Sequence, residues 1–130
     1  KPSISDAGDG FGGSISISGN LMAVGATGED SNQVTITNSS SASGNNDISN
    51  AGAVYIFERT GTSWAQVAYI KAPNPAVDDN FGVSVSLDNK TLLVTSWAED
   101  SNQTTITNGT TASANNSNAG SGAAYVFVLQ

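Results

Sequence analysis

The chain has 130 residues, of which 38% are hydrophobic and 12% charged, and its formal net charge is −7. This length supports one modest domain with a core, the acidic balance argues against nucleic acid or an anionic membrane as partner, and no apolar run is long enough for membrane insertion. The absence of Cys and His excludes disulfides, Cys/His zinc sites and a Ser-His-Asp triad. An acidic chain of this kind is expected to bind cations, and calcium is the first candidate.

The first half of the chain is predicted to form four β-strands. Residues 13–18 (GSISIS) alternate Ser with Ile, which is typical of a strand, and residues 21–26 (LMAVGA) are continuously apolar, as expected of a strand covered on both faces. Gly19-Asn20 forms a two-residue turn between them. Residues 52–59 and 63–72 give the third and fourth strands, joined at a turn around Gly61, and no segment has a helical period.

The second half repeats the first. Residues 1–60 align without gaps with residues 71–130, and 24 of the 60 aligned positions are identical. Strands are therefore expected at residues 83–87, at residues 91–97 (again covered on both faces) and at residues 122–129, with Asn89-Lys90 as the first turn. The counterpart of the fourth strand is absent. We divide the chain into a first repeat unit, residues 1–70, and an incomplete second unit, residues 71–130.

Four antiparallel strands per repeated unit are typical of a β-propeller blade, and the alternative is a sandwich of two homologous halves. Phe11-Gly12, the segment Val24-Gly25-Ala26 and the strand Ala53–Phe57 together resemble an FG-GAP repeat, the blade unit of the integrin α-subunit propeller and of many bacterial surface proteins. The resemblance implies an all-β fold of two four-stranded antiparallel propeller-type blades, the second without its outer strand.

Two features depart from that family. The second unit has Thr95-Ser96 in place of Gly25-Ala26. The calcium loop of integrin-type repeats resembles Asp-x-Asp-x-Asp-Gly, and no such run occurs. Asp9, with Asp79 as its counterpart, is a partial match only, so integrin-style calcium binding does not transfer directly.

A long insertion of about 25 residues separates the second and third strands of each unit, and each insertion opens with the motif EDSNQ, at residues 29–33 and 99–103. Insertions of this length have a function or a structure of their own. Carboxylates and amides could supply calcium ligands, or they could hydrogen-bond the insertion's own backbone. The candidate calcium ligands are Asp9, Glu29, Asp30, Asn46, Asp79, Glu99, Asp100 and Asn116.

The residues that follow the motif, QVTITN and QTTITN, alternate as in a strand around one Ile each, Ile36 and Ile106. We expect a small extra strand there that packs insertion on insertion between blades. Five Asn-x-Ser/Thr sequences are candidate glycosylation sites: Asn38, Asn89, Asn102, Asn108 and Asn115.

Catalysis has little support in the sequence. Adjacent carboxylates such as Glu29-Asp30 tend to point apart, and neither a His nor a phosphate loop is present. Trp64, Trp97 and Tyr69 could stack on a sugar, but aromatic residues of propeller strands more often pack between blades.

We therefore expect a non-catalytic module at the cell surface or outside the cell that associates with copies of itself as a ring or filament, with strand complementation as one route. The alternative is a fragment of a larger calcium-binding adhesion-type propeller that recognises a protein or glycan. The first residue is Lys1 and the only Met is Met22, so a processed or excised segment is expected.

Overall fold

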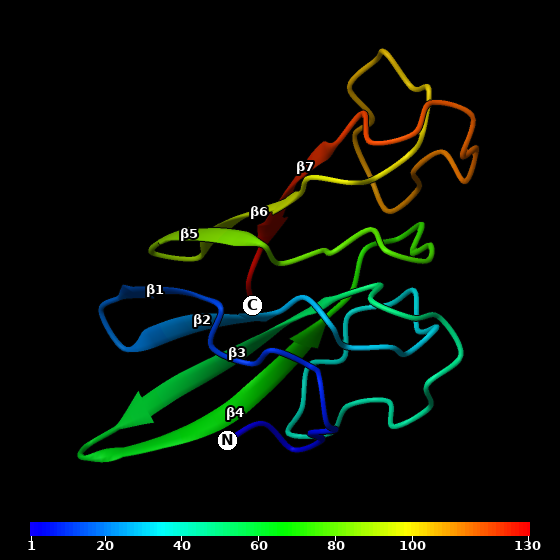
Figure 1. Ribbon diagram of the computed structural model, residues 1–130. Helices are drawn as coiled ribbons and strands as arrows, with labels where there is room; N and C mark the ends of the chain where they lie inside the picture. Colours follow the sequence, from blue (N-terminus) through cyan, green and yellow to red (C-terminus); the bar gives the residue numbers. More distant parts are fainter.

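Two antiparallel β-sheets, one above the other, form the molecule in the computed structural model, which describes residues 1–130 and contains no helix (Figure 1). We call the first sheet, with strand order β1-β2-β3-β4, the first blade, and the second sheet, with order β5-β6-β7, the second blade. The strands are β1 Ser14–Ser18, β2 Leu21–Ala26, β3 Ala53–Thr60, β4 Ser63–Ile70, β5 Ser84–Asp88, β6 Thr91–Ser96 and β7 Ala123–Val128. The predicted all-β fold is confirmed, and so is the missing outer strand of the second blade.

The repeat fixes the same register in both blades. Val24 of β2 lies opposite Tyr55 of β3, and their counterparts Val94 and Tyr125 lie opposite each other in β6 and β7. Both predicted two-residue turns are present, and Gly19 (φ 58°) and Asn89 (φ 51°) adopt the left-handed backbone that such turns require. The two halves of the sequence therefore fold as equivalent β-meanders.

The serine side of β1 faces the second blade. The side-chain hydroxyl of Ser14 donates to the carbonyl of Gly82, 2.7 Å away, and the hydroxyl oxygens of Ser16 and Ser18 accept the backbone N–H groups of Leu87 and Asn89, each at 2.9 Å. These bonds satisfy backbone groups at the edge of β5 that have no strand partner. The isoleucines of β1 consequently point away from the junction between blades.

The main hydrophobic core lies between the blades. It joins the inner face of the first blade to the β5, β6 and Phe81 side of the second blade, with the rings of Phe81 and Tyr125 in edge-to-face contact at 5.4 Å. Its buried members are Ala23, Val54, Ile56, Ala68, Ile70, Ala72, Phe81, Leu87, Leu92 and Val94. Burial of this apolar surface fixes how the blades stack.

A smaller core covers the opposite, outer face of the first blade. Tyr55 and Tyr69 lie there with ring centroids 5.1 Å apart, and Phe11 packs edge-on against Tyr55 and Phe57. Phe81, the counterpart of Phe11, packs in the same way against Tyr125 and Phe127. The Phe of each FG pair therefore caps the aromatic side of its own blade.

Gly25 shows why the GAP segment differs between units. A Cβ atom on Gly25 would overlap the carbonyl oxygen of Gly82 and the hydroxyl of Ser14, because the second blade approaches the β2 backbone closely there. Thr95 is the counterpart of Gly25, and no further sheet lies on its side of the second blade. The close approach that demands glycine at residue 25 does not exist at residue 95.

Two expectations about burial were wrong. Strand β6 is covered on one face only: Leu92 is fully buried, whereas Leu93 is 40% exposed, because no sheet covers the outer face of the second blade. Of the three aromatics expected to pack between blades, Trp97 is 64% exposed, Trp64 stacks its ring under Arg59, and Tyr69 lies in the outer core of the first blade.

The extra strand expected in each insertion does not form. A single antiparallel bridge joins Thr37 to Tyr69 of β4 within the first blade, and the second insertion has no bridge. Ile36 is 43% exposed and Ile106 is 92% exposed, so neither anchors a packed layer between blades. The alternating sequences QVTITN and QTTITN do not by themselves determine whether a strand forms, because Ser and Thr hydrogen bonds within the insertion compete with strand pairing.

Candidate functional site

The first EDSNQ motif contains a buried ion pair that sequence reasoning missed. The ammonium of Lys71 donates to Oε2 of Glu29 at 2.7 Å, and the side chains are 0% and 4% exposed. Burial lowers the pKa of Lys71, and the Glu29 carboxylate opposes that shift. Lys71 directly follows β4, so this pair ties the end of the outer strand to the start of the insertion. The positive partner of the Glu29 carboxylate is therefore a lysine of the same chain.

The other residues of this motif order the insertion. Asp30 accepts the backbone N–H of Asn50 at 2.7 Å, and the hydroxyls of Ser31 and Tyr69 share a hydrogen bond of 2.7 Å. Asn32 bonds to Asn45 and Asp47, and Gln33 donates to Thr35 and Thr37. This pattern is that of an insertion held by its own side chains, as one of the two sequence interpretations anticipated.

The second EDSNQ motif keeps the insertion bonds of its Asp and Gln but lacks the cation. Asp100 accepts the N–H of Gly120 at 2.7 Å, as Asp30 accepts that of Asn50, and Gln103 again donates to two threonines. Glu99 is 2% exposed, and its carboxylate accepts only neutral donors: the Asn74 amide at 2.8 Å and the Ser101 hydroxyl at 3.0 Å. A buried carboxylate therefore lies without a positive partner.

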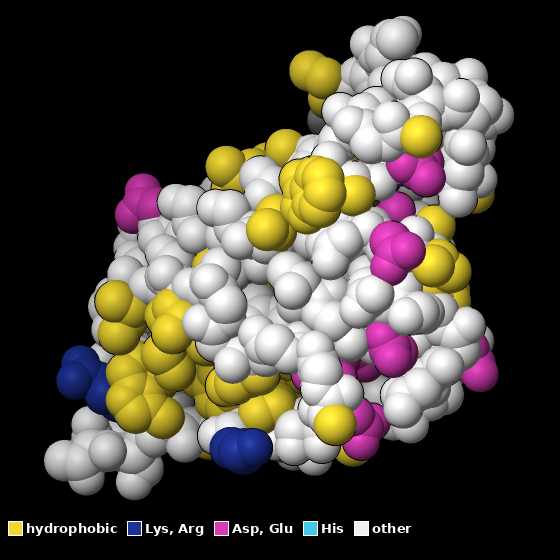
Figure 2. All heavy atoms as spheres, in the orientation of Figure 1, with side chains coloured by type: hydrophobic (Ala, Val, Ile, Leu, Met, Phe, Trp, Pro, Cys, Tyr) yellow, Lys and Arg dark blue, Asp and Glu magenta, His cyan; other side chains and the backbone are white.

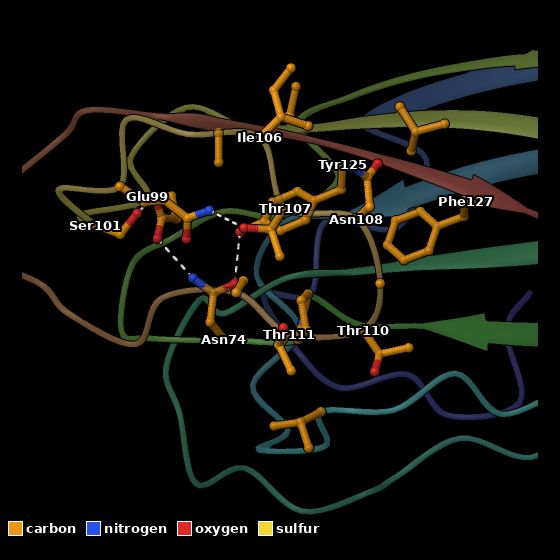
Figure 3. Close-up of a pocket in the computed structure, with 18 of the residues that line it drawn as sticks. Asn74, Glu99, Ser101, Ile106, Thr107, Asn108, Thr110, Thr111, Tyr125 and Phe127 are labelled. Carbon is orange, nitrogen blue, oxygen red and sulfur yellow. Dashed lines mark hydrogen bonds between the residues drawn. The ribbon is translucent and has the colours of Figure 1, made fainter.

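A groove of about 950 Å³ opens beside Glu99, between β7 and the second insertion (Figure 3). Glu99, Ser101 and Thr107 line it from the insertion, and Tyr125 and Phe127 line it from β7. In the first blade β4 occupies the corresponding place between β3 and Thr37. The groove is thus the space that a fourth strand of the second blade would fill.

The hydroxyls of Tyr69 and Tyr125 stay protonated and can donate hydrogen bonds. Burial raises the pKa of Tyr69 and of Tyr125 above the usual range, and the carboxylates of Glu29 and Glu99, respectively, raise it further. The hydroxyl of Tyr125 donates to Asn74 at 2.9 Å, and the Asn74 amide in turn donates to Glu99. Tyr125 and Glu99 therefore share one network at the floor of the groove.

Asp9 and Asp79 hold the turns that precede each FG pair. Asp9 accepts the N–H of Asp6, and Asp79 accepts the N–H of Ala76, both at 2.8 Å. The second carboxylate oxygen of Asp79 is buried without a hydrogen-bond partner. Loss of hydration on burial raises the pKa of Asp79 to about 6, and the nearby carboxylates of Glu99 and Asp100 add to the shift.

Six of the eight candidate calcium ligands lie in the two insertions, and Asp9 and Asp79 lie in the turns before the FG pairs. Figure 2 shows most of the visible acidic side chains on the insertion side of the molecule. No group of three or more Asp, Glu, His or Cys side chains is placed to hold a metal ion. Asn46 donates to Asp6 at 3.3 Å, and its counterpart Asn116 is exposed. Calcium binding stays a prediction of the sequence, whereas hydrogen bonds and one lysine already engage most of these carboxylates.

All five candidate glycosylation asparagines are exposed: Asn38, Asn89, Asn102, Asn108 and Asn115. Asn89 lies in the turn between β5 and β6, and the other four lie in the insertions. Their exposure is compatible with attached sugar, which stays a prediction.

Comparison with known families supports the fold. The sequence model of the FG-GAP repeat family matches residues 2–57 and 64–127, and the chain belongs to this family. Repeats of this family build β-propeller-type modules that often occur in extracellular or cell-surface proteins and are generally not enzymes. Neither a curated protein nor a solved structure matches the chain. No helix of the chain could span a membrane.

Proposed function

We propose that this chain is a non-catalytic structural module that works outside the cell or on its surface and associates head-to-tail with copies of itself. The observation that carries the proposal is a pair of apolar faces at the two ends of the blade stack. The chain leaves the outer side of β1 exposed at one end, beside the outer core of the first blade, and the outer side of the second blade exposed at the other. Each copy therefore has two different contact surfaces, one of which can bind the other surface of a neighbouring copy.

The first of these surfaces, the head face, is the outer side of β1, at the edge of the first blade. Ile15 and Ile17 are each 60% exposed there, beside the outer core of the first blade. Figure 2 shows a group of hydrophobic side chains over this blade. We infer that these exposed isoleucines form part of an interaction surface, since contiguous apolar patches on small domains often serve that role.

The second surface, the tail face, is the outer side of the second blade. Leu93, Val126 and Val128 are 40%, 66% and 77% exposed there. Their counterparts in the first blade include Ala23 and Ile56, which are buried in the junction between blades. The tail face therefore occupies the position that a following blade covers within the chain.

Contact between copies cannot repeat the internal junction unchanged. Thr95 and Leu93 stand where the first blade has Gly25 and Ala23, and Gly25 is the point of closest approach between the blades. These larger side chains require a different spacing or rotation at the contact between copies. A head-to-tail contact gives a ring if that rotation closes and a filament if it does not.

Mixing two single-face variants tests this proposal. Ile17→Lys places a charge on the head face and Val126→Lys places one on the tail face, at exposed positions that the fold of one copy does not need. Each variant alone should be monomeric by light scattering, whereas their 1:1 mixture should form a complex of two chains and stop there, because one intact head meets one intact tail.

Val77→Lys serves as the control, since Val77 is 58% exposed on the segment that links the blades and the substitution changes the net charge equally. It should associate like the native chain. A mixture of the two face variants that stays monomeric would contradict the head-to-tail proposal. So would an Ile17→Lys variant that still forms dimers alone, since that would indicate contact between identical tail faces.

A further inference from the structure

We propose that Asn108 is a site of spontaneous modification, at which the peptide nitrogen of Gly109 closes a ring on the asparagine side chain and converts it to isoaspartate and aspartate. Asn108-Gly109 is the only Asn-Gly pair in the sequence. The product carries one more negative charge than the unmodified chain, whose formal net charge is −7. This inference does not rest on head-to-tail association, because it uses neither end face of the blade stack.

Gly109 removes the main steric obstacle to this ring closure. In any Asn-x pair the attacking nitrogen belongs to residue x, and a side chain on that residue crowds the approach to the asparagine side-chain carbonyl. Gly109 has no side chain, and its φ of 127° lies in a region that residues with a Cβ rarely adopt. Nothing lies within 4 Å of the position that a Cβ would occupy there. The space beside the attacking nitrogen is therefore open.

Neither reacting group is engaged in a hydrogen bond. The bonds of this part of the second insertion join Gln103 to two threonines and to Ser113, and none uses the Asn108 amide or the Gly109 N–H. Both residues are exposed, and the second insertion has no bridge to a strand. Hydroxide can therefore reach the Gly109 N–H, and the Asn108 side chain is free to turn toward the nitrogen that attacks it.

The reaction needs no partner other than water. The Gly109 nitrogen, once its proton is lost to hydroxide, attacks Cγ of Asn108. A bond forms between these two atoms, the Cγ–Nδ2 bond breaks, and ammonia leaves with the proton that it takes from water. Water then opens the resulting succinimide ring. Addition at Cγ gives aspartate, whereas addition at the backbone carbonyl carbon gives isoaspartate, in which the main chain runs through the side-chain carbonyl.

Asn38 is the internal comparison, because it is the counterpart of Asn108 in the first insertion. It is also exposed, but Ser39 follows it, so a side chain crowds the attacking nitrogen. Thr37, the residue before it, is held to Tyr69 by two backbone hydrogen bonds of 2.9 Å. Asn38 is exposed although β4 passes beside this insertion, so a strand in the corresponding place beside β7 would leave Asn108 accessible.

The modification also bears on the glycosylation prediction, since Asn108 is one of the five candidate glycosylation asparagines. Attachment of sugar to Nδ2 and conversion to isoaspartate are exclusive fates of one side chain. Sugar needs the Cγ–Nδ2 bond, whereas ring closure breaks it. A molecule that has converted at Asn108 has therefore lost this acceptor for sugar.

Incubation of the intact chain at mildly alkaline pH, followed by proteolysis and mass spectrometry, tests the proposal. We expect residue 108 to gain about 1 Da, from the loss of ammonia and the addition of water. In water labelled with heavy oxygen, the new carboxylate should carry the label. An isoaspartate methyltransferase should add methyl groups to the product. Asn38 should stay unmodified over the period in which most of Asn108 converts.

Gly109→Ser is the matched variant, since it gives the second insertion the Asn-Ser pair of residues 38–39. It should slow conversion of Asn108 by about fivefold or more. No mass gain at Asn108 would overturn the inference, and this includes a chain that carries sugar there in every molecule. Equal rates at Asn38 and Asn108 would also overturn it, and so would an unchanged rate in Gly109→Ser. Head-to-tail association can fail without affecting any of these outcomes.

Discussion

Replacing Glu29 by Gln removes the negative partner of Lys71 while preserving the size of the side chain. The Lys71 ammonium, which is wholly buried, is then left without a counter-charge. Removing one partner of a buried pair costs about 3–5 kcal/mol of unfolding free energy, a large part of the stability of a domain of this size. Deprotonation of Lys71, whose pKa burial already lowers, would reduce this loss.

Glu99→Gln is the matched control, because it makes the same substitution at the same position of the repeat. No buried cation is left behind there. Asn74 can still donate to the amide oxygen of Gln, and the Gln NH2 group can donate to the hydroxyl oxygen of Ser101, because Asn74 and Ser101 bond to different oxygens of the carboxylate. We expect a cost of about 1 kcal/mol or less. Urea unfolding followed by circular dichroism measures both values, with the slope of the transition confirming that the same surface unfolds.

The double variant Glu29→Gln/Lys71→Met isolates the pairing itself. It should be more stable than Glu29→Gln alone, since it removes the unpaired charge together with its partner. Equal destabilisation by Glu29→Gln and Glu99→Gln would refute the reasoning. It would mean that the ion pair seen in one blade contributes nothing beyond what a neutral hydrogen-bonded carboxylate contributes in the other.

Three further predictions concern the junction, the pH response and metal binding. Gly25→Ala should cost about 2 kcal/mol or more, because the added methyl group would overlap the Gly82 carbonyl, whereas Thr95→Ala should change urea stability little; equal effects would contradict the close approach. Asp79 has a folded-state pKa of about 6, raised from 3.8, so the folded state binds more protons in this range and stability should rise as pH falls from 7 to 5. Asp79→Asn should remove that component, and an unchanged pH profile would disprove the assignment. EDTA, with or without added calcium, should leave the thermal midpoint unchanged, since hydrogen bonds and Lys71 already engage the motif carboxylates; a rise on adding calcium would favour the metal interpretation.

The strands were predictable because each has a local signal. The alternation of β1, the apolar run of β2 and the turn at Gly19-Asn20 are all visible within a few residues. The gapless repeat then placed β5, β6 and β7, and residues 71–130 contain no counterpart of β4. The direction in which each face points was not predictable, since β1 turns its serines toward the second blade and its isoleucines outward.

The candidate site was predictable in position but not in chemistry. The recurrence of EDSNQ located both insertions correctly, and the interpretation that their side chains bond their own backbone describes Asp30 and Asp100. The partner of Glu29 was missed, because Lys71 lies 42 residues away in sequence and meets it only through the path of β4. One signal was available: Lys71 immediately follows an apolar outer strand, where a charge must find a partner if it is buried.

The degenerate GAP segment of the second unit also had a physical cause that sequence alone could not give. From the sequence, Thr95 in place of the glycine of the GAP segment is only a departure from the family pattern. The structure shows that glycine is required at residue 25 because another blade approaches there. The same reasoning explains why Leu93 is tolerated opposite solvent. At these positions, the sequences of the two units therefore differ where one surface is covered by another blade and the other is not.

The mass of the native chain in solution, measured by light scattering across a concentration series, tests the central claim most directly. One chain has a mass of 13.1 kDa. Head-to-tail association predicts a weight-average mass that rises with concentration through multiples of this value, toward a fixed limit for a ring or without limit for a filament. A mass of one chain at every concentration would contradict the claim.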